Sequence, residues 1–302
     1  MCVRLRWLTR SLVMVGALCA AALVSVPAAA QPQLPPGVEP QGKLKEILQR
    51  GSVNIWMNAG FIPYETIDPA SGQFVGLDVD IAKMLFEDGL DLRIEFTDST
   101  FQGLVPALAT GKADFVISAM GATEERAQSV DFSIPYSPAG TVVIVRKDNT
   151  SINSLDDLSG KIVGGETGST PLRRAEVLNA DLQARGLPGF KELRSYDSAP
   201  TVWEDVRVGR LDAAPVGFSN AVLLIKERPD DFRIASRIGG ESYYAMVMPK
   251  GEQSLGDYVN AKIREWKADG SLLAVHRKWF GDFAPSILEE VAGLPNEVFY
   301  SR

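Results

Sequence analysis

Residues 101–118, FQGLVPALATGKADFVIS, contain the pattern that decides the fold of this chain. An apolar segment of helical character ends at Gly111, and a short hydrophobic strand follows the basic residue Lys112. Glycine readily takes the left-handed conformation that ends a helix, and a cation at that point suits the negative end of the helix dipole. The stretch therefore predicts a helix, a glycine turn and a buried strand in succession.

The same pattern occurs three more times along the chain. Each copy places a glycine beside an arginine or a lysine, and a short apolar strand follows. Such strands, alternating with helices, are typical of mainly parallel sheets whose faces are covered by helices. The further copies are LKEILQRGSVNIWMN at 44–58, SLDDLSGKIVGG at 154–165 and SAPTVWEDVRVGRLDAAPVG at 198–217.

Other segments add elements to this scheme. We predict Asp78 as the N-cap of a helix, because Asp commonly begins helices and an amphipathic run follows it. Asp80 is only two residues away and cannot share a helix face with Asp78, which argues against a catalytic carboxylate pair. We also expect a β-branched strand at 141–145, a strand at 243–249 and an amphipathic helix at 258–280.

The composition excludes several classes of protein. The 302 residues are 45% hydrophobic and 23% charged, which excludes a collagen, a disordered chain and a disulfide scaffold. The net charge of −7 argues against nucleic-acid binding, which needs a basic face. The single histidine, His276, leaves little room for a zinc site or a histidine-based triad. We therefore expect no metal, no cofactor and no nucleic-acid partner.

The first 30 residues have the features of a cleaved signal peptide. Three arginines precede an apolar run that is short for a membrane span, and the run ends in Pro27 followed by three alanines. Lipidation at Cys19 is a lesser alternative, because Leu18 is not the small residue usual at such sites. Removing 30 residues takes away three arginines and both cysteines, which leaves 272 residues with a charge of −10. We expect an exported protein without disulfides and with no later membrane span.

Three longer segments resemble the solute-binding proteins of polar amino-acid ABC transporters, the family-3 extracellular receptors. The resemblance covers about residues 44–282, and its specificity comes from the order and spacing of all three segments together. They are FIPYETIDPASGQFVGLDVDIAKML at 61–85, TFQGLVPALATGKADFVISAMGATEERAQSVDFSIPY at 100–136 and ADGSLLAVHRKWFGDF at 268–283.

The resemblance implies a periplasmic protein of the type II binding-protein fold, in which two α/β lobes close on a small solute. It implies two hinge strands, at about 136–141 and 238–243, and delivery of the solute to an inner-membrane ABC permease by a monomer without enzymatic activity. The expected organisation is a signal peptide at 1–30, a leader at 31–43, lobe I at 44–137 plus 242–283, lobe II at 138–241 and a C-terminal tail at 284–302.

In the first lobe, the resemblance assigns Arg126 to the α-carboxylate of the ligand. A guanidinium offers two parallel N–H donors to a carboxylate, and the alternative is a surface ion pair with a neighbouring glutamate. Phe61 and Phe101 match the two aromatic walls of the site, whereas Tyr64 is more consistent with core packing. Thr123 either donates to the carboxylate or caps the following helix. Backbone groups of three further residues would line the same loop: Ser118, Ala119 and Gly121.

In the second lobe, GGETGSTPLRR at 164–174 predicts a strand, a glycine-rich turn and a helix. The turn would present free N–H groups at the helix start, which form a seat for an anion. A phosphate-binding P-loop is the alternative, but its Gly-Lys-Ser/Thr ending is missing. The predicted donors are Thr167, Gly168, Ser169 and Thr170.

Two positions depart from the family pattern. Many relatives have Ser or Thr in place of Gly121, and an Asp that binds the ligand's ammonium in place of Gly217. A buried ammonium without an acidic partner is costly. Either Glu166, Glu65 or Glu241 replaces that Asp, or the ligand is an acid without an α-ammonium.

Two other functions remain open on this fold. Some proteins of similar architecture are cyclohexadienyl or arogenate dehydratases, and Glu166 could supply the general acid that such an enzyme needs. A sensory domain is less consistent with the sequence, because no kinase or membrane-spanning segment accompanies it.

Overall fold

The structure is a computed structural model that describes residues 34–281 and 285–300, without the side chains of Glu241 and Pro285. The predicted signal peptide lies outside the described residues, as does the start of the leader. None of the helices in the described ranges is long and apolar enough to cross a membrane.

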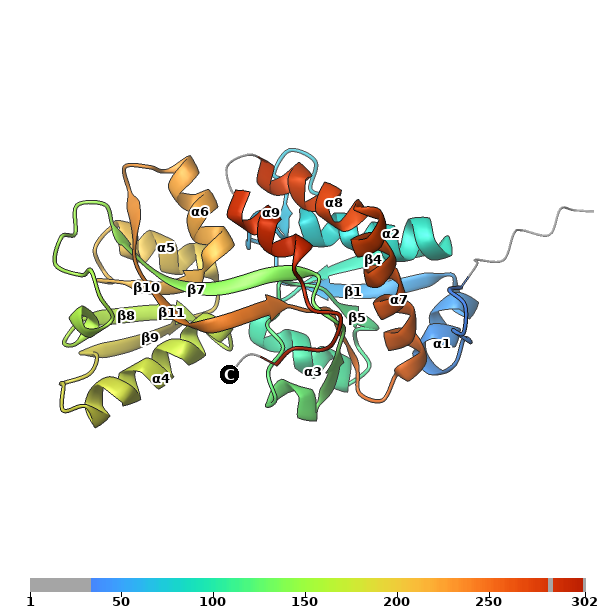
Figure 1. Cartoon of the computed structure of the whole chain (residues 1–302), viewed down its shortest axis with the longest axis horizontal. Helices are drawn as coiled ribbons and strands as arrows, with labels where there is room; N and C mark the ends of the chain where they lie inside the picture. Colours follow the sequence, from blue (N-terminus) through green and yellow to red (C-terminus); the bar gives the residue numbers. More distant parts are fainter. Residues whose placement is uncertain (1–33, 282–284, 301–302) are drawn as a thin grey trace, which may run out of the picture. The chain divides into compact units, whose positions relative to one another are not determined.

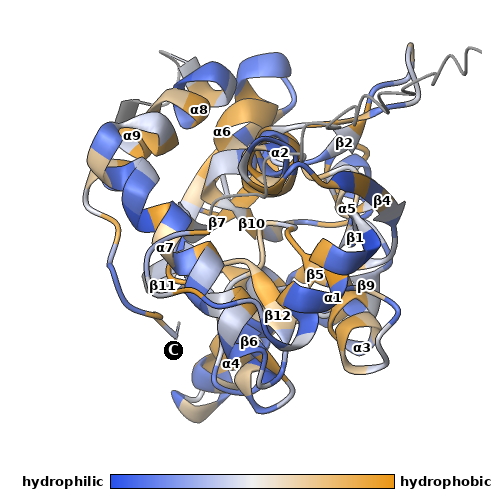
Figure 2. Cartoon of the chain, turned by 90° about the vertical axis from the view of Figure 1, so that its right-hand side faces the viewer, coloured by the Kyte–Doolittle hydropathy of each residue, from blue (hydrophilic) through white to orange (hydrophobic). Residues whose placement is uncertain are grey.

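The first group of elements surrounds a five-stranded sheet of order β4-β1-β5-β12-β6. The pairs β1–β4 and β1–β5 are parallel, and β12 runs antiparallel to β5 and β6. The hydropathy colouring shows β5 and β12 as hydrophobic, as the central strands of a buried sheet should be (Figure 2). The elements before residue 137 are α1 (Gly42–Arg50), β1 (Ser52–Met57), β2 (Thr66–Ile67), β3 (Phe74–Val75), α2 (Leu77–Leu90), β4 (Arg93–Asp98), η1 (Phe101–Gly103), α3 (Leu104–Ala109), β5 (Phe115–Val116), η2 (Arg126–Gln128) and β6 (Val130–Phe132).

The second group contains a parallel pair, β8–β9, and an antiparallel sheet of order β10-β7-β11. The parallel pairs agree with the predicted architecture, and the long strands β7 and β11 add antiparallel ones. The elements of this group are β7 (Ser137–Arg146), η3 (Asp156–Leu158), β8 (Ile162–Glu166), α4 (Thr170–Ala184), β9 (Glu192–Tyr196), α5 (Ala199–Arg207), β10 (Ala214–Gly217), α6 (Phe218–Glu227) and β11 (Phe232–Tyr244).

The segments predicted as hinges belong to β7 and β11, which run side by side between the two groups (Figure 1). Tyr243 pairs with Pro138, and Ile238 pairs with Thr141. The register shifts between Ile238 and Ser242, so β11 has an irregularity of the β-bulge type at this point. The chain therefore connects its two sheets through a pair of adjacent strands.

The elements after β11 return to the first group. The predicted strand at 243–249 is interrupted, because β11 ends at Tyr244 and β12 begins at Val247. The predicted single helix at 258–280 is also wrong, since Gly270 takes the left-handed conformation at φ 83° and separates two helices. These last elements are β12 (Val247–Pro249), α7 (Gln253–Asp269), α8 (Ser271–Phe280) and α9 (Pro285–Ala292).

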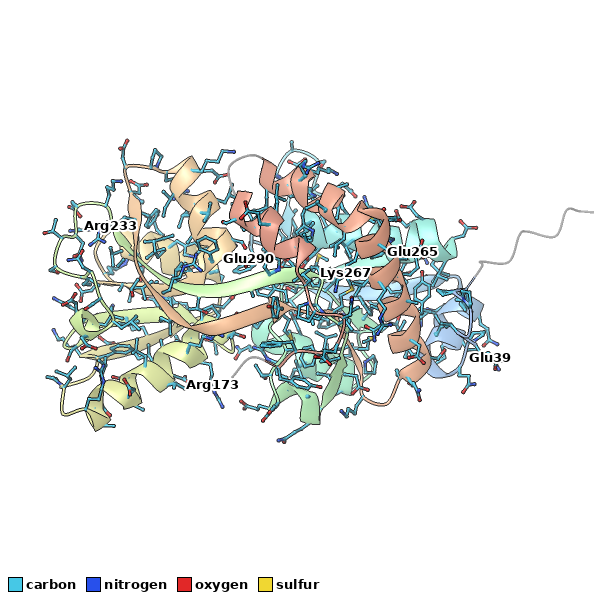
Figure 3. The ribbon with its side chains drawn as sticks, in the orientation of Figure 1. Glu39, Arg173, Arg233, Glu265, Lys267 and Glu290 are labelled. Atoms are coloured by element: carbon cyan, nitrogen blue, oxygen red, sulfur yellow. The ribbon has the colours of Figure 1, made fainter. Side chains whose placement is uncertain are left out.

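The C-terminal segment is part of the packed fold. Lys267 on α7 donates from Nζ to the carbonyl of Pro295 at 2.6 Å, and Glu290 lies on α9 (both labels in Figure 3). The ring of Phe299 meets that of Tyr243 edge to face, 4.9 Å between centroids. Three buried side chains of this segment join the core of the first group: Ile287, Val291 and Leu294.

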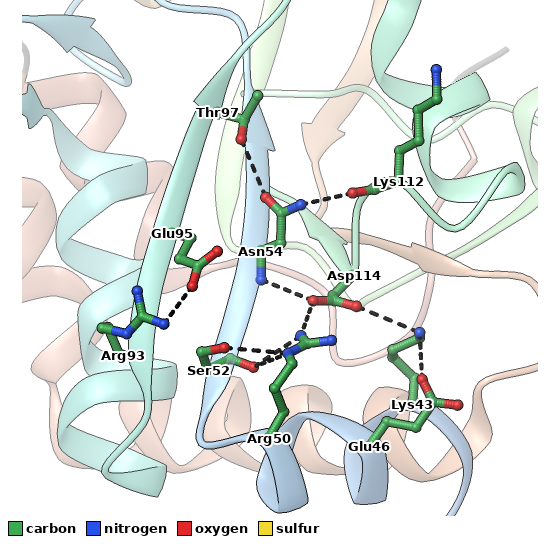
Figure 4. Close-up of polar contacts among 10 residues, drawn as sticks. All are labelled: Lys43, Glu46, Arg50, Ser52, Asn54, Arg93, Glu95, Thr97, Lys112 and Asp114. Carbon is green, nitrogen blue, oxygen red and sulfur yellow. Dashed lines mark hydrogen bonds and ion pairs between the residues drawn. The ribbon is translucent and has the colours of Figure 1, made fainter.

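Basic residues beside the glycine turns form ion pairs that tie elements together. Arg50 pairs with the buried Asp114, and Nζ of Lys43 lies 3.4 Å from the same carboxylate (Figure 4). Arg210 pairs with Asp205 at 2.5 Å. At these two turns the arginine therefore forms an ion pair with a carboxylate, in addition to its interaction with the helix dipole.

Candidate functional site

An apolar pocket lies between residues of the first and second groups. Its lining is mostly nonpolar and aromatic with a few polar groups, which is typical of sites for small molecules. Seven of the predicted site residues line this pocket: Phe61, Phe101, Ala119, Glu166, Ser169, Thr170 and Gly217. Seven other lining residues were not predicted from the sequence: Pro171, Ala199, Val202, Trp203, Pro215, Val216 and Tyr244.

The two predicted aromatic walls lie where the sequence predicts them. Phe61 follows β1, and its ring is 5.9 Å from that of Tyr64 and 6.5 Å from that of Tyr244. Phe101 begins η1 and lines the same pocket. Tyr64 belongs to the core instead, because it is fully buried and its hydroxyl lies 2.9 Å from Oγ of Ser137.

Arg126 is partly buried at the start of η2 and reaches across to the second group. Its Nη1 donates to the carbonyl of Gly121 at 2.5 Å and to Oγ1 of Thr170 at 3.3 Å. Its Nη2 donates to the carbonyl of Gly168 at 2.7 Å. A guanidinium has five N–H donors, so Nε and one hydrogen of Nη2 remain for a further acceptor. Adjacent N–H groups of a guanidinium are well suited to the two oxygens of a carboxylate.

The charge of Arg126 is available for binding. Glu125, one predicted alternative partner, pairs with Arg173 at 2.7 Å instead. Burial lowers the pKa of Arg126 to about 10, which still leaves it charged at neutral pH. Its guanidinium carbon lies 5.4 Å from the centre of the Phe101 ring, so the aromatic wall also supports the cation.

Arg126 does not line the apolar pocket itself. It lines an adjoining polar cavity together with Thr123 and Gly168. Phe101, Ser169 and Thr170 line both spaces and form the boundary between them. Ten of the twelve predicted site residues therefore line two adjoining cavities, whereas Gly121 and Thr167 line neither.

The loop after β5 is held by backbone contacts. Oγ1 of Thr123 accepts a hydrogen bond from the N–H of Arg126 at 3.2 Å, so the Thr123 hydroxyl contacts the first residue of η2, whose N-cap is Glu125. A Cβ on Gly121 would lie 2.8 Å from Oγ1 of Thr170. The missing side chain at Gly121 thus allows the first group to approach the start of α4 closely.

The predicted anion seat at the start of α4 is smaller than the sequence suggested. The N–H of Thr167 donates to the carbonyl of Tyr196 at 2.8 Å, and that of Ser169 donates to the carbonyl of Glu166 at 3.1 Å. Oγ of Ser169 caps the helix by accepting from the N–H of Leu172. Thr167 and Ser169 are therefore not free donors, because the turn uses their N–H groups itself. The N–H groups of Gly168 and Thr170 are left as the candidate donors of the predicted set.

Glu166 is the acidic residue of the apolar pocket. It is 7% exposed, and its Oε1 has no hydrogen-bond partner among the described residues. Burial raises the pKa of Glu166 to about 7, and a hydrogen bond from the backbone of Ala199 acts in the opposite direction. A carboxyl group in this state can exchange its proton for a cationic partner near neutral pH.

Glu65 belongs to a buried carboxyl pair outside the pocket. Its Oε1 accepts from Oγ of Ser118 at 2.6 Å. Burial and the neighbouring charge of Asp78 raise the pKa of Glu65 well above its ordinary value. The side chain of Glu241, the third acid considered, lies outside the described residues.

Asp78 does not cap its helix. The N-cap of α2 is Gly76, and Asp78 is fully buried in the first turn. Its carboxylate accepts from the N–H of Ala119 at 2.8 Å and from the hydroxyl of Tyr136 at 2.7 Å. Because Ala119 lines the apolar pocket, the buried carboxyl pair positions one of its walls.

Gly217 leaves little space for a side chain. A Cβ on Gly217 would lie 2.7 Å from Oη of Tyr244 and 3.2 Å from Cζ of Phe61. It would also lie 2.8 Å from Oδ1 of Asn220, so three neighbouring side chains close the space beside Gly217. Within the described residues, no group of three or more His, Cys, Asp and Glu side chains is arranged to hold a metal ion.

Comparisons with known proteins identify the family of this chain. The family model for bacterial extracellular solute-binding proteins, family 3, matches residues 53–282. The L-cystine-binding protein TcyJ of Escherichia coli (strain K12) is 29% identical over 242 residues, which cover 80% of this chain and 87% of that protein. The L-arginine-binding protein of Pseudomonas aeruginosa is 31% identical over 238 residues, covering 76% and 87%.

Solved structures are similar over most of their length. An ancestral arginine-binding protein bound to arginine is 35% identical with a TM-score of 0.70, covering 77% of this chain and 99% of that one. The ancestral amino-acid-binding protein AncCDT-1, a precursor of cyclohexadienyl dehydratase, is 31% identical with a TM-score of 0.71, covering 79% and 100%.

Proposed function

Because the chain belongs to the bacterial extracellular solute-binding proteins of family 3, we propose that it closes on a small carboxylate-bearing solute and delivers it to the permease of an ABC transporter. Its α/β fold is the two-lobed, type II fold of periplasmic binding proteins. The protein acts in the periplasm as a monomer, after export by the signal peptide of residues 1–30.

Arg126 carries this proposal. Its remaining N–H donors suit a carboxylate, and it bridges the loop at Gly121 and the turn at Gly168, which belong to different halves of the fold. A solute held by Arg126 and by the N–H groups of Gly168 and Thr170 would join the two halves. The strand pair β7–β11 is the connection about which the halves would move.

A thermal-shift screen tests the proposal. The screen compares amino acids, their deaminated derivatives, small organic acids and neutral sugars, since a ligand that binds only the native state raises its apparent stability. We expect stabilisation only by compounds with a carboxylate. A neutral sugar as the sole stabilising compound would contradict the proposal.

The Arg126→Ala variant should lose the stabilisation, because removing one partner of a desolvated charge pair costs about 2–5 kcal/mol, roughly 30- to 5,000-fold in affinity. The matched control is Arg185→Ala, which removes an arginine that pairs with Asp156 and Asp181 on the surface. The control should bind as the wild type does. Equal binding by the Arg126→Ala variant would refute the assignment.

A dehydratase is the second candidate function, and the state of Glu166 favours it. A carboxyl group with a pKa of about 7 in a mostly apolar pocket has the properties of a general acid. Incubation with prephenate or arogenate, followed by detection of phenylpyruvate or phenylalanine, distinguishes the two functions. The transport proposal expects no product above the background of the Glu166→Gln variant.

A further inference from the structure

Glu166 supplies the only carboxylate among the residues that line the apolar pocket. The remaining lining includes the nonpolar side chains of Val202, Trp203 and Val216, which surround the acid with a medium of low polarity. The Oε1 atom of Glu166 has no partner among the described residues, although burying a carboxylate without one is unfavourable. The geometry thus leaves one acidic oxygen for a group that the solute brings.

We propose that Glu166 binds the ammonium group of an α-amino acid with a nonpolar side chain, whose carboxylate binds Arg126. This inference rests on the proposed function above and adds the class of solute. Ser169 and Thr170 line both the apolar pocket and the polar cavity, so the two charged residues lie on either side of one short turn. A compact zwitterion can therefore face both.

The charge balance of the site selects this class. Arg126 is matched by one carboxylate and Glu166 by one ammonium, which leaves no net charge buried. A dibasic amino acid such as arginine brings a second cation. The polar cavity offers this cation no equivalent partner, since Glu125 pairs with Arg173 and Glu176 is exposed. Arginine should therefore bind less tightly than a nonpolar amino acid.

The position at Gly217 supports the role of Glu166. An acid at this point would collide with Tyr244 and Phe61, so the second group presents its carboxylate from the end of β8 instead. The nonpolar side chain of the solute would then contact α5 through Val202 and Trp203. Burying a side chain of that size contributes about 1.5–3 kcal/mol.

Three matched pairs of compounds test the inference by calorimetric titration. They are L-phenylalanine with 3-phenylpropanoate, L-leucine with 4-methylpentanoate, and L-methionine with 4-(methylthio)butanoate. Each pair differs only in the ammonium group. At least one amino acid should bind at least about 30-fold more tightly than its deaminated partner, as expected for a buried charge pair. L-Arginine should bind more weakly than that amino acid.

The Glu166→Gln variant provides the second part of the test. Gln has nearly the same shape but no charge, so affinity for the amino acid should fall by at least about 30-fold while affinity for the deaminated acid stays the same. The control variant Glu176→Gln alters an exposed glutamate beside the polar cavity and should bind as the wild type does. Circular dichroism and the melting temperature establish that the variants fold.

The outcomes separate this inference from the proposed function. If the deaminated acids bind as tightly as the amino acids, if arginine binds most tightly, or if Glu166→Gln has no effect, the inference is wrong while carboxylate binding stands. If none of the three amino acids binds but an organic acid does, the inference is also wrong. If no compound with a carboxylate binds, the proposed function fails as well.

Discussion

Binding of a nonpolar amino acid should weaken as the pH falls below 7, because Glu166 must lose a proton to accept an ammonium. With a pKa of about 7, Glu166 is about nine-tenths protonated at pH 6 and about one-tenth protonated at pH 8. The dissociation constant should therefore be about tenfold larger at pH 6 than at pH 8. The dissociation constant increases as the pH falls because the ligand's ammonium binds the ionised form of Glu166, and protons compete with the ligand for this carboxylate at low pH.

The neighbouring groups do not produce this effect. Burial raises the pKa of Glu65 well above its ordinary value, and Glu65 does not line the apolar pocket. Arg126 remains charged, with a pKa of about 10. Burial raises the pKa of Asp78 to about 6, but Asp78 is enclosed by Tyr136 and Ala119 and does not line the pocket. Any effect of Asp78 titration on binding should therefore be the same in the wild type and in the Glu166→Gln variant.

Isothermal titration with L-phenylalanine, L-leucine or L-methionine in buffers of different ionisation enthalpy measures the proton release directly. At pH 6 the wild type should release about 0.9 proton per ligand, and at pH 8 about 0.1. The Glu166→Gln variant should bind weakly at both pH values without this release. An affinity that is independent of pH, or one that increases as the pH falls, would refute the reasoning.

Three further predictions concern the fold around the site. Glu65→Gln should reduce the loss of stability that occurs as the pH rises above the ordinary pKa of a carboxyl group, by up to about 1.4 kcal/mol per pH unit in urea unfolding, because a carboxyl pKa raised by folding gives stability that is lost as the pH rises. An unchanged slope would contradict the raised pKa of Glu65. Gly217→Asp should lower the unfolding free energy by about 1–3 kcal/mol through its collision with Tyr244, whereas Gly240→Asp, built into open space, should not. Ile287→Ala should lower the free energy of unfolding by about 2–5 kcal/mol, because it removes a buried side chain. The control Val177→Ala, at an exposed position, should lower it by at most about 0.5 kcal/mol. Equal denaturation midpoints for the two variants would show that α9 is not part of the core.

Local rules predicted the glycine turns well. Gly51, Gly111, Gly160 and Gly209 all have φ between 70° and 77°, as expected for residues that end helices or tight turns. The same rule applied to Gly270 would have divided the predicted helix at 258–280 correctly. These features were predictable because they depend on only a few neighbouring residues.

Contacts between distant segments were not predictable from local patterns. Asp78 has the sequence features of an N-cap, but the hydroxyl of Tyr136 and the N–H of Ala119 bind its carboxylate in the core. The N–H groups of Thr167 and Ser169 are used within the turn and by β9. The choice of Glu166 over Glu65 depends on which carboxylate faces the pocket, and only the three-dimensional arrangement decides this.

A crystal structure of the protein with a bound nonpolar amino acid tests the central claim most directly. We predict that the carboxylate of the ligand lies about 2.7–2.9 Å from two nitrogens of Arg126. The ammonium group of the ligand should lie within hydrogen-bond distance of Glu166. A ligand whose carboxylate makes no contact with Arg126, or one bound away from the apolar pocket, would contradict it.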